Sequence, residues 1–162
     1  MPPLNQNFYG YWPGETGLTM PRGAFLNQRP IQSSQAVPGP QQFFSLCARS
    51  TQVMAQPFPC KIRMLGSAAY NLLIVGAGWA LGAVEATPKI WDIAAVWPIL
   101  HAAGVTWVAL DGADPFPLVA GQDYSGQPYP TLVSAQATWV PLFQPLVMGG
   151  APQTNAAPLP RG

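Results

Sequence analysis

The 162-residue sequence has few charged residues. Asp, Glu, Lys and Arg make up 8% of it, against about 25% in ordinary soluble domains. The net charge is +1 and the seven basic residues are scattered, so the chain offers no basic field for nucleic acid. The low charge indicates a thinly charged surface or a face that another polypeptide covers.

Cysteine is also scarce. Cys47 and Cys60 lack a C-x-x-C spacing and have no His nearby. This pattern predicts buried, reduced thiols in a cytoplasmic protein over a disulfide or a metal pair. No signal-peptide pattern follows Met1, which agrees with that compartment.

One uncharged stretch, residues 64–84, approaches the ~20 residues that a membrane-spanning helix needs. Four glycines and Asn71 dilute it, and neither end carries a basic cluster. We therefore predict no membrane segment. The sequence also has no P-loop, Rossmann fingerprint or nucleophile elbow.

The sequence does contain alternating strand and helix patterns. Ser67 can cap a helix over residues 68–80, and a second helix, kinked by Pro98, is expected from residue 91 or 92 to residue 104. Short apolar segments predict strands at residues 43–48, 61–65, 81–86, 105–110 and 131–135. Such alternation is typical of βαβ units. Residues 139–147 are a poor helix candidate, because Pro141 and Pro145 interrupt them.

Aromatic residues 8–12 and the turn pattern of residues 23–30 predict the hairpins of a separate antiparallel sheet. The expected fold class is therefore α/β: the end of an antiparallel sheet, followed by a mostly parallel sheet flanked by helices.

Glu85 and Asp92 are the two carboxylates in a long apolar neighbourhood. A carboxylate there is costly unless it is paired or bound to a metal. Asp92 is expected near a helix N-terminus, where a carboxylate is favourable and a phosphate can also bind. The plain alternatives are a helix-capping Asp92 and an exposed Glu85 at a strand end.

The segment G-S-A-A at residues 66–69, followed by V-E-A-T-P-K-I-W-D-I-A-A at residues 84–95, resembles the inositol monophosphatase family of metal-dependent phosphatases. That family has a G-[ST]-A-A segment, then a Glu seven residues before the Asp of a W-D-x-A-[AG] motif. Residues 23–30, G-A-F-L-N-Q-R-P, are similar to a family hairpin, and residues 105–116 are similar to its late strand. The resemblance covers about residues 17–146.

The resemblance implies roles for five residues. Asp92 would bind a catalytic Mg²⁺, and Glu85 would accept a hydrogen bond from a substrate hydroxyl. Gly66, Ser67 and Ala68 would form a small-residue wall facing the substrate, although ordinary helix capping also explains them. The implied reaction is attack of a metal-activated water on a small phosphate ester, such as an inositol or sugar monophosphate.

The sequence departs from the family in one respect. The N-terminal Glu and the D-P-[IL]-D-G-T-x-N-F motif, which supply most of the metal ligands, are absent from these residues. The chain thus looks like the C-terminal part of a family member, with Met1 an internal start, a truncation or the start of one half of a split protein. The expected organisation is a remnant of the N-terminal sheet domain (1–31), a linker (32–42), a C-terminal α/β domain (43–148) and a disordered tail (149–162).

These observations leave two hypotheses. The first is the C-terminal part of a Mg²⁺-dependent phosphomonoesterase, in which Mg²⁺ binds weakly or not at all and catalysis is absent from this chain alone. Its partners would be a small phosphate ester and the missing N-terminal half or a homodimer partner. The alternative is a non-catalytic interaction or oligomerisation module retained from a phosphatase fold.

Overall fold

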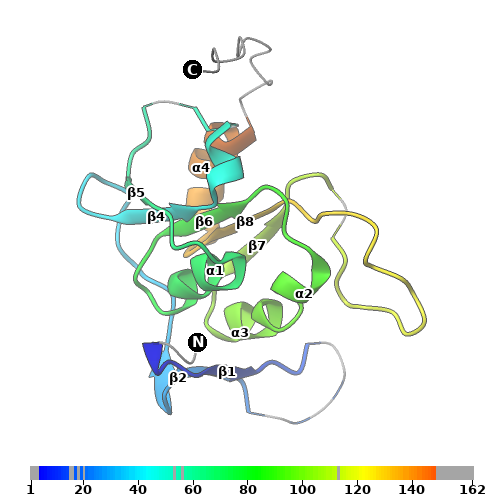
Figure 1. Cartoon of the computed structure of the whole chain (residues 1–162). Helices are drawn as coiled ribbons and strands as arrows, with labels where there is room; N and C mark the ends of the chain where they lie inside the picture. The colour runs from blue at the N-terminus through cyan, green and yellow to red at the C-terminus, as the bar shows by residue number, and fades with distance from the viewer. Residues whose placement is uncertain are drawn as a thin grey trace.

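The computed structural model describes residues 4–14, 17, 19, 21–52, 54, 55, 57–112 and 114–148. These residues form four layers (Figure 1). From the top of that view they are α4 (Val140–Met148) with the 3₁₀ turn η2 (Ala48–Gln52), a five-stranded sheet, the helices α1 to α3, and a three-stranded sheet. A second 3₁₀ turn, η3 (Ala137–Trp139), precedes α4.

The lowest layer is an antiparallel sheet. Its strands, in spatial order, are β1 (Phe8–Tyr11), β2 (Gly23–Leu26) and β3 (Arg29–Ile31). Asn27 and Gln28 connect β2 to β3 with φ angles of 47° and 68°. Two consecutive left-handed residues match the right-handed twist of a hairpin, so the hairpin predicted at residues 23–30 is confirmed.

The second sheet has the order β5-β4-β6-β8-β7. Its strands are β4 (Phe43–Leu46), β5 (Lys61–Arg63), β6 (Gly82–Glu85), β7 (Thr106–Ala109) and β8 (Thr131–Ser134). β4 is parallel to β5 and β6, whereas β8 is antiparallel to β6 and β7. β8 is thus the one reversed strand in a mixed sheet, and the predicted α/β class is confirmed.

Three helices separate the sheets. α1 (Ala68–Gly76) begins where predicted, because the Ser67 side chain accepts a hydrogen bond from the Tyr70 N–H at 3.4 Å. It ends four residues before residue 80, since the chain turns at Gly78, whose φ is +76°. The six residues 71–76 of α1 are all buried, as expected for a helix enclosed between layers.

The predicted helix over residues 91–104 is divided into α2 (Ile90–Ile93) and α3 (Val96–Ala102). Proline clashes with the carbonyl group four residues earlier, and the division begins at Ala94, four residues before Pro98. Pro98 is the third residue of α3, a position whose N–H needs no acceptor within the helix. The chain therefore forms two short helices here, in place of the single helix with an interior kink that the sequence predicted.

The prediction for residues 139–147 was wrong, because α4 is a helix over Val140–Met148. Pro141 lies in its first turn, where a missing N–H costs little. Pro145 removes one internal hydrogen bond, but Phe143 and Val147 are buried. The Phe143 ring packs 5.0 Å from the Phe44 ring, so burial offsets the lost bond.

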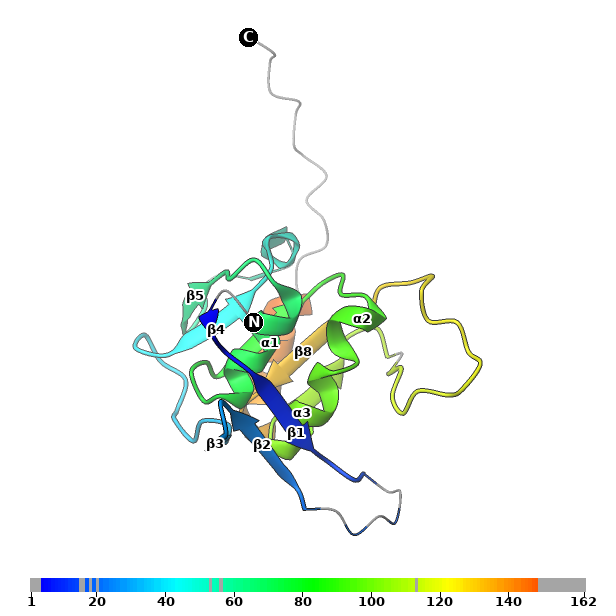
Figure 2. The same ribbon diagram turned by 60° about the horizontal axis from the view of Figure 1, so that its bottom comes forward.

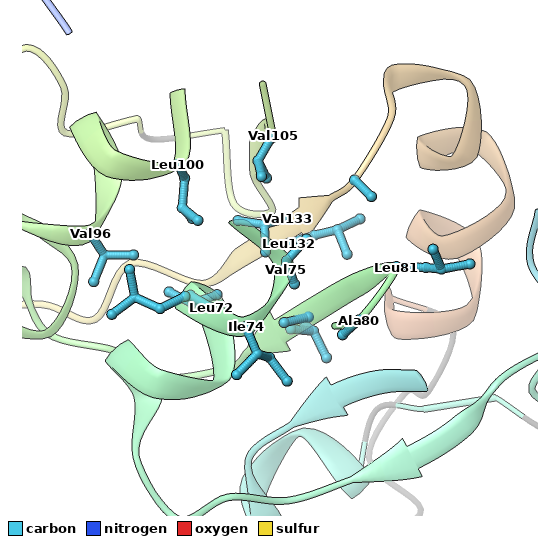
Figure 3. Close-up of a cluster of buried hydrophobic side chains, with 14 of the residues drawn as sticks. Leu72, Ile74, Val75, Ala80, Leu81, Val96, Leu100, Val105, Leu132 and Val133 are labelled. Atoms are coloured by element: carbon cyan, nitrogen blue, oxygen red, sulfur yellow. The ribbon is translucent and has the colours of Figure 1, made fainter. Parts of the chain in front are cut away.

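The main core lies between the five-stranded sheet and the helices α1 and α3 (Figure 3). It includes Leu72 and Val75 of α1, Leu100 of α3 and Val133 of β8. This packing fixes the N-terminus of α1 beside the carboxyl ends of β4 and β6. No helix in the described part of the chain has the length and apolarity needed to span a membrane.

The residues between β3 and β4 form no helix or strand, and the division into domains stays a prediction. The expected disordered tail, residues 149–162, lies outside the described residues.

Candidate active site

A pocket of about 550 Å³ lies at the carboxyl ends of β5, β4 and β6. In α/β sheets, ligands bind preferentially in crevices at this end of parallel strands. The lining residues come from four segments that the parallel pairing brings together: Cys47, Ala48 and Arg49; Met64, Gly66, Ser67, Ala68 and Asn71; Glu85, Thr87 and Pro88; and Asp92.

All five residues singled out in the sequence line this pocket. Gly66 precedes the cap of α1 with a φ of +75°, a conformation that favours glycine. Ser67 caps α1, and Ala68 is its first residue, so the positive end of the helix dipole lies at the pocket wall. Glu85 ends β6 and Asp92 lies in α2.

Glu85 is 2% exposed, which excludes the exposed strand-end alternative. Its Oε1 accepts a hydrogen bond from Asn71 Nδ2 at 2.7 Å. Burial raises the pKa of the Glu85 carboxyl, and the Asp92 carboxylate raises it further, while hydrogen bonds from Asn71 and Cys47 oppose the rise. The site thus holds a carboxylate whose charge is costly, as expected beside an apolar core.

Asn71 holds this carboxylate in place. Its Oδ1 accepts hydrogen bonds from Ser45 Oγ at 2.7 Å and from the Leu65 N–H at 3.1 Å. Because a backbone N–H can only donate, the atom facing Leu65 is the amide oxygen, and the amide nitrogen faces Glu85. Asn71 therefore joins β4, the turn before α1 and β6 in one buried network.

The sequence contained a signal for Asn71 that we did not use. It is an amide in an otherwise apolar helix, four residues after the capping Ser67. Such a residue needs a buried partner, and its position on the first turns of α1 faces the ends of the strands.

Asp92 is half-buried and lies at the third position of α2. Its Oδ2 accepts a hydrogen bond from the Lys89 N–H at 2.8 Å. The capping role expected as the plain alternative is therefore present. It uses one carboxylate oxygen, so capping alone does not decide whether Asp92 also binds a metal.

Sequence reasoning also missed two residues at the rim. Arg49 Nη1 donates to Thr87 Oγ1 at 2.9 Å, which places a cation at the rim of the pocket that the two acids also line. Cys47 lines the same pocket, and its Sγ lies 3.1 Å from Ser50 Oγ. Both cysteines are free, as predicted, but Cys47 is half-buried whereas Cys60 is buried.

The described residues do not by themselves fit a Mg²⁺ ion. They contain no group of three or more His, Cys, Asp or Glu side chains placed to hold a metal. The pocket has two carboxylates, of which Glu85 is engaged by Asn71. Mg²⁺ requires near-octahedral oxygen coordination, which this set does not complete.

A larger hollow of about 720 Å³ lies elsewhere, lined by Trp12, Trp97, Phe116 and Leu118 with neighbouring prolines and small residues. Its lining contains no acid, base or nucleophile, so we place the candidate chemistry in the smaller pocket.

A sequence model of the inositol monophosphatase family matches residues 2–138 of the chain. The chain belongs to the inositol monophosphatase family. No curated protein sequence gives a significant match to the chain.

Several solved structures share the fold. An inositol monophosphatase from Anabaena (Nostoc) sp. PCC 7120 superposes with a TM-score of 0.65 at 21% identity, over 94% of this chain and 60% of its own. A hypothetical Pyrococcus horikoshii protein with similarities to inositol-1 monophosphatase gives 0.65 at 19%, over 90% and 54%. The Thermotoga maritima enzyme gives 0.58 at 25%, over 78% and 48%. The chain thus spans about half to three-fifths of these relatives.

Proposed function

We propose that this inositol monophosphatase family chain supplies the substrate-facing half of a Mg²⁺-dependent phosphomonoesterase site. The substrate is a small phosphate ester, such as an inositol or sugar monophosphate. The remaining metal-binding acids come from a polypeptide segment outside this chain. The observation that carries the proposal is that Gly66, Glu85 and Asp92, which belong to the turn before α1, to β6 and to α2, line one pocket.

Each residue has a part that its surroundings support. Glu85 is buried and held by Asn71, so it can accept a hydrogen bond from a substrate hydroxyl in one fixed orientation. Gly66, Ser67 and Ala68 bring the N-terminal end of α1 to the pocket without bulky side chains, and helix N-termini favour anions. Asp92 is one ligand of a shared Mg²⁺ site.

The family is metal-dependent, but the donor set of this chain is incomplete. A single carboxylate competes poorly with the hydration of Mg²⁺. We therefore expect this chain alone to bind Mg²⁺ weakly or not at all and to turn over no substrate.

Phosphate release from inositol and sugar monophosphates tests the proposal. The purified chain with Mg²⁺ should give no turnover, and activity should appear when a polypeptide carrying the D-P-x-D-G-T motif completes the site. Asp92→Asn should then abolish that activity, whereas Asp123→Asn, a change in an exposed loop, should not. Robust turnover by the chain alone that Asp92→Asn abolishes would refute the predicted inactivity.

A second candidate is a non-catalytic interaction module. The low charge of 8% favours it, as do exposed apolar side chains such as Trp91, which is 66% exposed. Analytical ultracentrifugation separates the two, because a well-folded monomer that binds no polypeptide would count against an interaction module.

A further inference from the structure

Among the residues that line the smaller pocket, Arg49 is the charged one to which the proposed reaction assigns no part. Asp92 is assigned to the metal and Glu85 to a substrate hydroxyl, and the N-terminal end of α1 favours the phosphate. The rest of an inositol or sugar monophosphate carries neutral hydroxyl groups. Such a substrate leaves the Arg49 guanidinium without a partner.

The backbone that carries Arg49 is fixed to the end of β6. Arg49 belongs to η2, and the next residue, Ser50, is 0% exposed. Ser50 Oγ donates a hydrogen bond to the Val84 carbonyl oxygen at 3.3 Å and accepts one from the Ala86 N–H at 3.1 Å. Val84 and Ala86 flank Glu85 in the sequence. Arg49 is therefore held beside the strand end that carries Glu85.

The guanidinium of Arg49 is anchored through one of its nitrogens. Nη1 donates to Thr87 Oγ1 at 2.9 Å, and Arg49 makes no other hydrogen bond or ion pair with the part of the chain that the structure describes. The side chain is exposed, and a guanidinium carries several N–H donors in a planar fork. The remaining donors can make two parallel hydrogen bonds to one carboxylate or phosphate group.

Charges of both signs line the pocket, since Glu85 and Asp92 lie in it with Arg49. An anionic group of a ligand is repelled by the two acids and attracted by the guanidinium, so it is most favourable at the rim. The pocket volume of about 550 Å³ lies in the range of about 300–1,000 Å³ that small-molecule sites occupy. The pocket therefore has room for a sugar with two anionic groups.

We propose that Arg49 selects substrates that carry a second anionic group, a phosphate or a carboxylate, besides the phosphate ester that is hydrolysed. Arg49 forms two parallel hydrogen bonds to that second group, while Thr87 holds the guanidinium in place. The inference rests on the proposed function for the reaction at the ester, whereas anion binding at Arg49 depends on the residues of this chain alone.

Isothermal titration of the full chain, without metal, tests the proposal with three ligands that share one carbon skeleton. Glucose 6-phosphate has a single anionic group, 6-phosphogluconate adds a carboxylate, and glucose 1,6-bisphosphate adds a second phosphate. At equal ionic strength, a ligand whose second group binds Arg49 should bind about fivefold more tightly than glucose 6-phosphate, the upper end for an exposed ion pair. The tighter of the two-anion ligands identifies the preferred group.

Substitutions of Arg49 locate the second anion. Arg49→Gln should remove the preference and leave the affinity for glucose 6-phosphate unchanged, because the amide can still donate to Thr87 but lacks the charge and the fork. Arg49→Lys should keep part of the preference, because an ammonium group has the charge but not the fork. It also gives a second reading should Arg49→Gln fail to fold.

Arg29→Gln is the matched control, because it makes the same change in net charge and should leave the preference intact. Arg29 is an exposed residue of β3, in the three-stranded sheet (Figure 2). The helix layer and the five-stranded sheet separate that sheet from η2 (Figure 1).

The proposal is overturned if all three ligands bind equally, or if none binds at millimolar concentration. It is also overturned if the preference survives in Arg49→Gln or is lost in Arg29→Gln. A loss of glucose 6-phosphate binding in Arg49→Gln as large as the loss for the two-anion ligands would overturn it as well, because Arg49 would then bind the ester phosphate itself.

Turnover by the completed site separates this inference from the proposed function. Hydrolysis of glucose 6-phosphate and of the two-anion esters with equal kcat/KM would refute the selectivity and leave the phosphatase function intact. Selective binding at Arg49 without hydrolysis of any of these esters by the completed site would refute the proposed function and leave the anion site intact.

Discussion

The polarity of the buried hydrogen bond between Asn71 and Glu85 can be reversed by two substitutions. Asn71 Nδ2 lies 2.7 Å from Glu85 Oε1, and the two residues are 1% and 2% exposed. Asn71→Asp alone replaces the donor by a second carboxylate. A hydrogen bond to a charged group contributes about 1.5–3 kcal/mol, and repulsion adds to its loss. We therefore expect Asn71→Asp to lower the free energy of unfolding by about 3 kcal/mol at pH 7.

Adding Glu85→Gln to Asn71→Asp should restore most of that loss. The new amide at position 85 can donate to the new carboxylate at position 71. That carboxylate still accepts the hydrogen bonds that Ser45 and Leu65 now donate to Asn71. Ser45, Leu65 and residue 85 then each keep a hydrogen bond to residue 71, and only the bond between residues 71 and 85 has its donor and acceptor exchanged. The double variant should therefore be more stable than Asn71→Asp.

Urea unfolding followed by circular dichroism measures the four proteins: the unsubstituted chain, both single variants and the double variant. The loss in Asn71→Asp corresponds to a melting temperature lower by roughly 6–12 °C for a chain of this size. The reasoning is refuted if Asn71→Asp costs less than about 0.5 kcal/mol, the usual range of a surface change. It is also refuted if the double variant is no more stable than that single variant.

Sequence reasoning worked for the fold where the decisive contacts are local. The Ser67 cap bonds an amide three residues away, and the hairpin at residues 23–30 depends on its own two turn residues. It failed at α4 because the compensation for Pro145 is tertiary. Phe143 packs against Phe44, about a hundred residues earlier in the chain, and no local pattern contains that contact.

The candidate site also contains residues that local spacing predicts and residues whose positions depend on tertiary contacts. Motif spacing placed Glu85, Asp92 and the turn at Gly66 in one set, and they line one pocket. Asn71 was missed although an amide in an apolar helix signals a buried partner, whereas the position of Arg49 depends on which strands are neighbours. The parallel pairing of β4 with β6 brings Arg49 to Thr87. Strand order is a property of the assembled sheet, so the rim of the pocket could not be read from the motifs.

Three further substitutions test the pocket and the packing of strand β6. Glu85→Gln should stabilise the chain at neutral pH, because the raised pKa of Glu85 makes its charge costly in the folded state. The folded carboxyl takes up protons more readily than the unfolded one, so the gain should shrink as the pH falls toward the ordinary glutamate value of 4.5. Each unit of pKa rise is worth about 1.4 kcal/mol. A gain independent of pH in unfolding titrations would contradict this. Asp92→Asn keeps an acceptor for the Lys89 N–H and loses only a charge near a helix N-terminus, so thermal unfolding should show a cost of about 0.3–1 kcal/mol. Gly82→Ala should cost about 1–3 kcal/mol in urea unfolding by overpacking, because its Cβ would lie 2.6 Å from a ring carbon of buried Phe44 and 2.9 Å from a backbone oxygen of β8. The strand pairing holds that oxygen, so the ring alone cannot relieve the clash. Gly126→Ala is the control, since a Cβ there meets nothing within 4 Å. Equal stabilities for the two alanine variants would mean that β6 and β8 are less closely packed than the structure shows.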